Sequence, residues 1–298
     1  MNPQLVSVLE DALLAETGSL CRLTTVSPLT GGCIHSSYRL ICENGRSYFC
    51  KISSDPSVKM LKRESEGLVA LSEAASIQSA QPLVCGSISS LGKEFLITEF
   101  IEPGTPRLNF FERFGQDLAR MHRDLSGERF GFHHDNYLGC TPQPNQWTAV
   151  WCDFWRGQRL GCQVELLQRK TYATPELQGL CRELMEQLED RIGGTGEPAC
   201  LLHGDLWSGN FLVDEQGSAV LIDPAVYYGE READLAMCRL FGGFGAGFYR
   251  SYEDEWPFQP EAARRIEIYQ VYHLLNHLNL FGAGYLSDCI DLLRRILR

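Results

Sequence analysis

Residues 203–210 read His-Gly-Asp-Leu-Trp-Ser-Gly-Asn, and a short apolar stretch ending in Ile222-Asp223-Pro224 follows them. Asp205 and Asn210 stand five positions apart, and Asp223 comes 18 residues after Asp205. Transfer of a γ-phosphoryl group needs an Asp that accepts the proton of the acceptor hydroxyl, and oxygen ligands that hold Mg²⁺ against the ATP phosphates. We therefore interpret Asp205 as the catalytic base, and Asn210 and Asp223 as the magnesium ligands.

The order and spacing of these residues support this interpretation. Five positions is the offset between the base and the metal-binding Asn in kinase catalytic loops. Apolar residues at 211–213 and 219–222 flank turn-forming residues at 214–217, which predicts a hairpin that returns the chain to the same site. Lone Asp and Asn residues in loops more often cap turns or helix ends, but that alternative does not require this spacing.

A second kinase-like tetrapeptide, His122-Arg123-Asp124-Leu125, lacks the metal-binding partner. Arg129 stands where the Asn would be. Apolar side chains recur at helical spacing from Phe111 to Met121, so the tetrapeptide is predicted to end an amphipathic helix. Its His and Arg are then expected to serve the helix C-terminus.

The first hundred residues predict a nucleotide-binding sheet. Short β-like runs at 20–26, 37–42 and 47–52 indicate antiparallel strands. Residues 30–38 join the first two, and the backbone N–H groups of Gly31, Gly32, Cys33 and Ile34 are predicted to approach the phosphates. An ordinary glycine turn is the alternative, because neither a six-residue glycine fingerprint nor a Walker sequence is present.

Lys51 lies one strand after this loop, where a kinase lysine contacts the α- and β-phosphates. It needs a carboxylate partner, and the following predicted helix, 57–72, offers Glu64 and Glu66. Glu64 is the predicted partner because it shares one helix face with Leu68 and Leu71. The alternative for Lys51 is a solvated lysine on an edge strand.

An interlobe hinge is predicted near residues 102–105, after a buried strand at 95–101. Backbone groups of Glu99, Phe100 and Ile101 are predicted to meet the adenine edge. The pattern therefore predicts an α+β, bilobal fold. Residues 1–101 form a small nucleotide-binding lobe with an antiparallel sheet, and residues 102–298 form a larger, mainly helical lobe with the catalytic loop and acceptor pocket.

Beyond these motifs, the chain closely resembles the fructosamine kinase family, also called ketosamine-3-kinases, over nearly its whole length. The family belongs with aminoglycoside and choline kinases in the protein-kinase-like fold. Features particular to the family are Trp207 within the quoted stretch, Phe130-Gly131, residues 135–139 and 143–145, Trp151 with Phe154, Arg159-Leu160, Tyr228-Gly229 with Arg231-Glu232, residues 240–244 and the segment 272–285.

The resemblance implies transfer of phosphate from ATP, with Mg²⁺, to the sugar 3-hydroxyl of a ketosamine, the adduct formed when a sugar glycates an amine. The phosphorylated adduct then decomposes and frees the amine, so the family is regarded as a repair system for glycated lysines or small amines. Microbial and plant relatives usually prefer ribulosamines and erythrulosamines to fructosamines, and we expect the same preference here. Free amines and protein-bound lysines both remain open as substrates.

Four residues are predicted to contact the acceptor. Trp207 would form a wall against the sugar and stack on its C–H face, although a Trp beside a catalytic loop also serves packing. His273, Asn276 and His277 lie on or near one helical face and could line the pocket, or could be satisfied polar residues of a core helix. His203 is expected to support the loop by hydrogen bonding.

Two alternative functions share much of this pattern. A kinase acting on an aminoglycoside, choline or another sugar would keep every catalytic residue and differ only in its acceptor pocket. A non-catalytic pseudokinase that binds a partner would be expected to lack Lys51, Asp205, Asn210 or Asp223, and all four are present.

The amino-acid composition limits the classes of partner and the location that are expected for this protein. A net charge of −11 argues against nucleic acid and anionic membranes as partners. No signal peptide or membrane span is visible, so a cytoplasmic location is expected. The 12 cysteines are scattered without metal-like spacing and are expected to be mostly buried, reduced thiols. Cys33 is the predicted exception: its oxidation, including formation of an intermolecular disulfide, would inhibit ATP binding in a monomer or redox-dependent homodimer.

Overall fold

The computed structural model describes residues 2–30, 35–55 and 59–298, and the chain forms two compact units. The first unit contains residues 1–108 and 212–223; the second contains residues 109–211 and 224–298. The first boundary between the units therefore lies after Leu108. The hairpin that follows residues 203–210, the predicted catalytic loop, joins the first unit although it comes after most of the second unit in sequence. The sequence had predicted a single boundary after residue 101.

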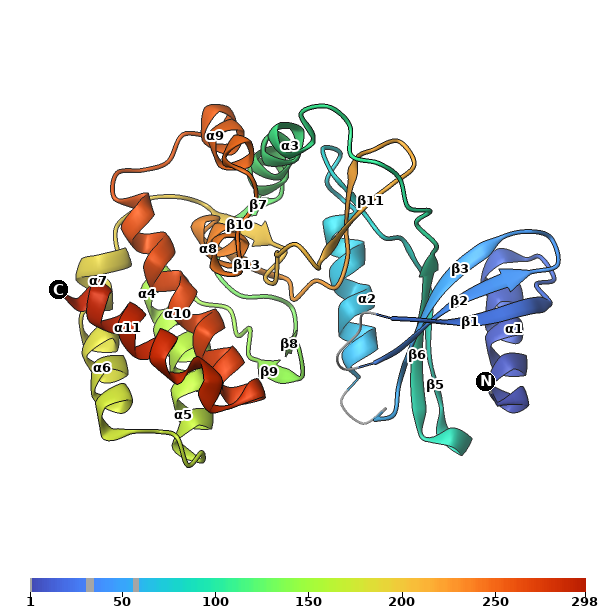
Figure 1. The fold of residues 1–298 in the computed structure, drawn as a ribbon, viewed down its shortest axis with the longest axis horizontal. Helices are drawn as coiled ribbons and strands as arrows, with labels where there is room; N and C mark the ends of the chain where they lie inside the picture. Colours follow the sequence, from blue (N-terminus) through green and yellow to red (C-terminus); the bar gives the residue numbers. More distant parts are fainter. Residues whose placement is uncertain (1, 31–34, 56–58) are drawn as a thin grey trace. The chain divides into compact units, whose positions relative to one another are not determined.

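The first unit is built on a five-stranded antiparallel sheet in the order β1-β2-β3-β6-β5. Two helices, α1 and α2, lie on opposite sides of it (Figure 1). A hairpin supplies two strands of a separate three-stranded sheet in the order β11-β12-β4, in which β12 pairs in parallel with the short β4. The elements are α1 (Pro3–Thr17), β1 (Leu23–Leu29), β2 (Ser36–Cys42), β3 (Ser47–Ser53), α2 (Met60–Leu71), β4 (Gln78–Ser79), β5 (Pro82–Ile88), the 3₁₀ turn η1 (Ser89–Leu91), β6 (Lys93–Glu99), β11 (Phe211–Val213) and β12 (Ala219–Leu221).

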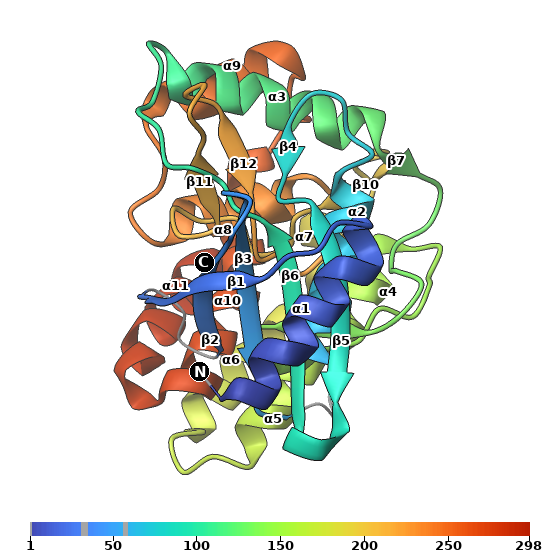
Figure 2. The same ribbon diagram turned by 90° about the vertical axis from the view of Figure 1, so that its right-hand side faces the viewer.

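Strand alternation separates the two faces of this sheet. Tyr48, Cys50 and Ile52 of β3 belong to the core under α1, which lies across that face in Figure 2. Successive side chains of a strand point to opposite faces, so Lys51 points toward the α2 side. The face of the sheet that carries Lys51 is thus set by a simple two-residue period.

The N-terminal helix α1 has no counterpart among the predicted elements, yet its ends follow standard chemistry. The side chain of Asn2 accepts a hydrogen bond from the backbone N–H of Gln4, and Gly18 ends the helix with a φ of 66°. Three leucines at helical spacing are buried against the sheet: Leu5, Leu9 and Leu13. Burial of this apolar stripe stabilises the helix far more than its intrinsic propensity does.

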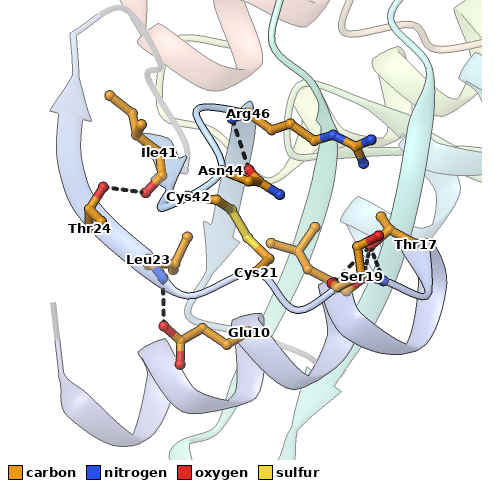
Figure 3. The surroundings of a disulfide bond; sticks show 11 residues. Glu10, Thr17, Ser19, Cys21, Leu23, Thr24, Ile41, Cys42, Asn44 and Arg46 are labelled. Carbon is orange, nitrogen blue, oxygen red and sulfur yellow. Dashed lines mark hydrogen bonds between the residues drawn. A yellow bond between two sulfur atoms is a disulfide. The ribbon is translucent and has the colours of Figure 1, made fainter.

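A disulfide between Cys21 and Cys42 corrects the expectation of reduced thiols for these two residues (Figure 3). The two positions are 21 residues apart in sequence, but pairing of β1 with β2 places Leu23 opposite Cys42. The Cα atoms of the cysteines are therefore only 5.4 Å apart. Nine described cysteines are free, and six of them are buried.

Reduction of this disulfide is expected to lower the free energy of unfolding by about 3 kcal/mol, because the unfolded chain regains the entropy of an open loop. The measurement is urea unfolding with and without a reducing agent. A Cys21→Ser variant should resemble the reduced protein, whereas Cys140→Ser, which changes an exposed free thiol, should not. Equal stability of the reduced and untreated wild type would contradict the prediction.

The second unit is mainly helical, with a three-stranded sheet in the order β13-β10-β7 and a separate β8-β9 hairpin. The long helix α10 packs against α8 and α11. No helix in the described ranges is both long and apolar enough to cross a bilayer. The elements are α3 (Phe110–Asp124), β7 (Ser126–Gly127), β8 (Asn136–Leu138), β9 (Thr141–Gln143), α4 (Trp151–Phe154), the π-helical η2 (Trp155–Gly161), α5 (Cys162–Gln168), α6 (Pro175–Glu186), α7 (Leu188–Ile192), β10 (Ala199–Leu202), β13 (Tyr227–Gly229), α8 (Glu232–Leu240), α9 (Ala246–Glu255), α10 (Ala262–Phe281), η3 (Ala283–Tyr285) and α11 (Leu286–Leu297).

A buried carboxyl group is expected to make the stability of this unit depend on pH. Glu230 accepts hydrogen bonds from the Thr195 hydroxyl (2.5 Å) and the Tyr269 hydroxyl (2.7 Å), and Trp151 donates in turn to Tyr269. Burial nevertheless raises the pKa of Glu230 to about 7, from an ordinary 4.5. The folded state therefore favours the protonated carboxyl, and the stability that this preference contributes is lost as the pH rises from 4.5 through about 7.

The free energy of unfolding of a Glu230→Gln variant, relative to that of wild type, is accordingly expected to rise by roughly 3 kcal/mol as the pH goes from 4.5 to 8, because the amide cannot ionise. Denaturant unfolding of both proteins across this range measures the difference. Glu253→Gln, at an exposed position of α9, is the control and should follow wild type. A pH-independent difference between Glu230→Gln and wild type would refute the assignment.

Candidate active site

The first unit brings three of the predicted site residues together around one ammonium group. Lys51 is 7% exposed, and its Nζ lies 2.8 Å from Glu64 Oε1 and 2.5 Å from Asp223 Oδ1. Burial alone would lower the pKa of Lys51, but the two carboxylates outweigh it and raise the pKa above its ordinary value. Burial, and then Asp223, raise the pKa of Glu64, because one ammonium serves two carboxylates.

Glu66, the alternative partner of Lys51, faces elsewhere. Its carboxylate lies 2.7 Å from Arg63 and 3.9 Å from Lys62 on the same helix. The helical period puts residues two positions apart on different faces, so Glu64 and Glu66 cannot both reach β3. In the structure, the carboxylate that pairs with the Lys51 ammonium from α2 is that of Glu64.

Glu94 of β6 holds α2 in this position, a role that the sequence did not reveal. Its buried carboxylate accepts hydrogen bonds from the backbone N–H groups of Leu61 (3.2 Å) and Lys62 (3.1 Å) in the first turn of α2. An acceptor from a distant strand thus satisfies helix-end donors that a local cap usually satisfies. Burial raises the pKa of Glu94 despite these bonds.

Asp223 follows β12 at the end of the predicted hairpin. The hairpin turn is closed by a hydrogen bond from the Gly217 N–H to the Asp214 carbonyl, 2.8 Å long. Asp223 has a φ of 55°, in the left-handed region. Asp tolerates this conformation better than most residues, and non-glycine residues held there are concentrated at functional sites.

The remaining predicted nucleotide contacts are placed only in part. Gly31, Gly32, Cys33 and Ile34 lie outside the described residues, so their phosphate contacts and the redox role of Cys33 stay predictions. Glu99 ends β6, and its backbone N–H donates to the Gln81 carbonyl. Phe100 packs under the guanidinium of Arg39, and Ile101 is half-buried. Adenine contacts of Glu99, Phe100 and Ile101 likewise remain predictions.

The catalytic loop belongs to the second unit and follows β10. The Asn210 side-chain N–H group donates to the Asp205 carbonyl (2.7 Å) and to Asp205 Oδ2 (3.0 Å), so the two residues fix each other. His203 is fully buried, and the Asp205 N–H donates to its Nδ1 at 3.3 Å. This contact is the loop support that was expected of His203.

Asp234 of α8 anchors the start of this loop, and sequence reasoning missed it. Its two carboxylate oxygens accept hydrogen bonds from the N–H groups of His203 and Gly204, both 2.7 Å long. Burial would raise the pKa of Asp234, but hydrogen bonds and charge from His122 hold it below its ordinary value.

His122, from the kinase-like tetrapeptide at the end of α3, has a different role from the predicted one. Its Nε2 lies 3.1 Å from Asp234, and its Nδ1 lies 2.8 Å from the Tyr252 hydroxyl. Its side chain is thus committed to the anchor of the catalytic loop instead of to the C-terminus of its own helix. Tertiary packing brings α3 and α8 together, which a pattern within one helix does not encode.

Two buried amides hold the chain just after Asp223. The Asn136 side chain donates to the Val226 carbonyl (2.7 Å), and the Gln143 side chain donates to the Ala225 carbonyl (3.0 Å). The Ala225 N–H also donates to the His203 carbonyl at 2.8 Å. The β8-β9 hairpin therefore supports the segment that returns beside the catalytic loop.

The four predicted acceptor contacts lie in different surroundings. Trp207 is 38% exposed on the catalytic loop. His273 and Asn276 are buried in α10, where burial lowers the pKa of His273 to about 3 and Asn276 accepts from Gln163. His277 is half-buried among three rings, those of Phe241, Phe281 and Tyr285. Of the three α10 residues, His277 is the most accessible, and the acceptor roles of all four stay predictions.

Known proteins resemble this chain over its full length. The family model described as fructosamine kinase matches residues 6–298. A chloroplastic protein-ribulosamine 3-kinase of Oryza sativa subsp. indica is 39% identical over 282 residues, which is 94% of this chain and 81% of that protein.

Solved structures agree with this result. A crystal structure of a candidate fructosamine-3-kinase from Thermobifida fusca is 30% identical, with a TM-score of 0.86 over 98% of this chain and 99% of that one. An aminoglycoside phosphotransferase, 17% identical with a TM-score of 0.63 over 97% of this chain and 98% of its own, shares the fold. The predicted α+β, protein-kinase-like fold is confirmed, and the chain belongs to the fructosamine kinase family.

Proposed function

We propose that this protein transfers the γ-phosphoryl group of ATP to the sugar 3-hydroxyl of a ketosamine, and so starts the release of the glycated amine. The observation that carries the proposal is the complete set of phosphoryl-transfer groups in hydrogen-bonded arrangements. Asp205 and Asn210 are bonded to each other in the second unit, and Lys51 is bonded to Glu64 and Asp223 in the first. Membership of a kinase family implies that ATP is the donor.

The proposed roles follow from the charges of these groups. Asp205 orients the acceptor hydroxyl and takes its proton as the bond to phosphorus forms. Lys51, kept charged by its two carboxylates, stabilises the negative charge of the α- and β-phosphates.

The donor atoms of Asn210 and Asp223 fit a magnesium ion. The Nδ2 atom of Asn210 is committed to Asp205, which leaves its Oδ1 available as a ligand, and Asp223 supplies a carboxylate. Oxygen donors are those that Mg²⁺ prefers. We propose that these two residues would hold Mg²⁺, which would offset the negative charge of the ATP phosphates.

For the acceptor, the rice relative is named a protein-ribulosamine 3-kinase, which supports ribulosamines and, by their smaller size, erythrulosamines as preferred substrates over fructosamines. The amine is either small or a lysine side chain of a glycated protein. We also propose that the reaction takes place in the cytoplasm.

A Glu64→Gln substitution is expected to lower kcat/KM for ATP roughly 30-fold. The amide removes one of the two charged hydrogen bonds of Lys51, a contact worth about 2 kcal/mol. Glu66→Gln is the matched control on the same helix and should stay within about twofold of wild type. Equal losses in the two variants would show that Glu64 acts only through the stability of α2.

The proposed function is tested by ATP consumption with Mg²⁺ against ribulose-lysine, erythrulose-lysine, fructose-lysine, choline and kanamycin. Turnover confined to the ketosamines, with the smaller sugars preferred, is the expected result. Turnover of choline or kanamycin alone would overturn the acceptor assignment and leave the kinase chemistry standing. If none of these acceptors supports ATP consumption, the acceptor is expected to be a different sugar, and a panel of free sugars would then identify it.

A further inference from the structure

Trp207 and Gly209 are in close contact on the catalytic loop. The loop turns between residues 207 and 210, where the Asn210 N–H donates to the Trp207 carbonyl at 2.9 Å. Within this turn the indole folds back over Gly209. A Cβ atom built on Gly209 would lie 2.5 Å from both Cζ2 and Cη2 of Trp207, which is closer than carbon atoms pack.

Glycine is not required at position 209 by the backbone. Twelve described glycines have a positive φ, and Gly209 is not one of them. Position 209 is also exposed, and the three nearest atoms that a Cβ would meet all belong to the Trp207 ring. A larger residue here would therefore collide first with the indole, which would have to shift.

We propose that Gly209 is a positioning residue that lets the indole of Trp207 pack closely against the loop and serve as a stacking platform for the acceptor. The ring packs against Gly209, and 38% of the residue stays exposed. A flat apolar π-face suits the C–H groups of a short sugar chain such as that of a ketosamine. The acceptor class in this inference rests on the proposed function, but the contact between Trp207 and Gly209 does not.

A Gly209→Ala substitution is expected to push the indole off the loop. KM for ribulose-lysine should rise about tenfold, the equivalent of losing one stacking contact, while KM for ATP and the melting temperature stay unchanged. Gly179→Ala is the matched control, because Gly179 also lacks a positive φ and a Cβ there would meet nothing within 4 Å. It should leave both KM values at the wild-type level.

A double-mutant cycle with Trp207→Phe separates this role from a general effect on the loop. Phenylalanine keeps an aromatic face but has a shorter reach, so the Gly209→Ala penalty should largely disappear in the Trp207→Phe background. An equal penalty in both backgrounds, a rise in KM for ATP, or an unchanged acceptor KM in Gly209→Ala would each overturn the proposal.

Failure of the proposed function would look different. If another acceptor is used, the same cycle is measured with that acceptor. Acrylamide quenching of Trp207, taken as the difference between each protein and its Trp207→Phe counterpart, needs no substrate. Greater quenching in Gly209→Ala than in wild type is expected, and equal quenching would refute the contact.

Discussion

Replacement of Asp205 by Asn is expected to lower kcat about 1000-fold, the loss typical of removing a general base. An amide has nearly the same shape and can still accept the hydrogen bond that Asn210 donates to Asp205 Oδ2. It cannot take a proton from the acceptor hydroxyl. The effect should therefore fall on kcat, with KM for ATP and the melting temperature little changed.

Steady-state kinetics over a range of ATP and ketosamine concentrations provide the test. The control is Asp291→Asn, an identical chemical change at an exposed position of α11, which should retain full activity. A kcat of the Asp205→Asn variant within tenfold of wild type would show that proton removal by this group is not important for the rate.

The second large effect is expected at Gly204, one residue before the base. Gly204 has a φ of 82°, and a Cβ there would lie 2.1 Å from the carbonyl oxygen of Ala225. Its N–H also donates to Asp234. Gly204→Ala should lower the free energy of unfolding by more than about 2 kcal/mol. It should also lower kcat roughly 100-fold, because the base is displaced from its productive position.

A matched control separates the strain of a positive φ from the steric clash of a Cβ at position 204 with the Ala225 carbonyl oxygen. Gly194 has a similar φ of 73°, but a Cβ there would meet nothing within 4 Å. Gly194→Ala should cost about 1 kcal/mol of stability and leave kcat unchanged. If the Gly204→Ala and Gly194→Ala variants lose the same stability and both stay active, then contact between Gly204 and Ala225 does not hold the loop.

The sequence brought together the residues of the proposed phosphoryl-transfer site because their pattern lies in short stretches of the chain. Asp205 and Asn210 lie on one loop, and their spacing reflects a local turn in which each side chain reaches the other. The hairpin before Asp223 follows from apolar runs flanking a turn. The choice of Glu64 over Glu66 required only the period of a helix.

Other features depended on residues far apart in sequence. Asp234 reaches the loop from 30 residues away, and Glu94 caps α2 from 32 residues downstream. The sequence contains these carboxylates but does not show which backbone N–H groups they meet. Cys21 and Cys42 were similarly expected to be free thiols. The pairing of β1 with β2 places them side by side, and they form a disulfide.

The sequence by itself determined the family and the reaction class, and it singled out the residues proposed to carry charge in the reaction, because these depend on residue type and local spacing. Only the tertiary structure decided how those residues are held. Anchoring of the loop by Asp234 and His122, the cap on α2 and the contact of Trp207 with Gly209 arise from the packing of side chains and backbone in three dimensions. Such contacts leave no periodic or spacing signal in a single sequence, since the partners in each contact are set by which elements pack against each other in the fold.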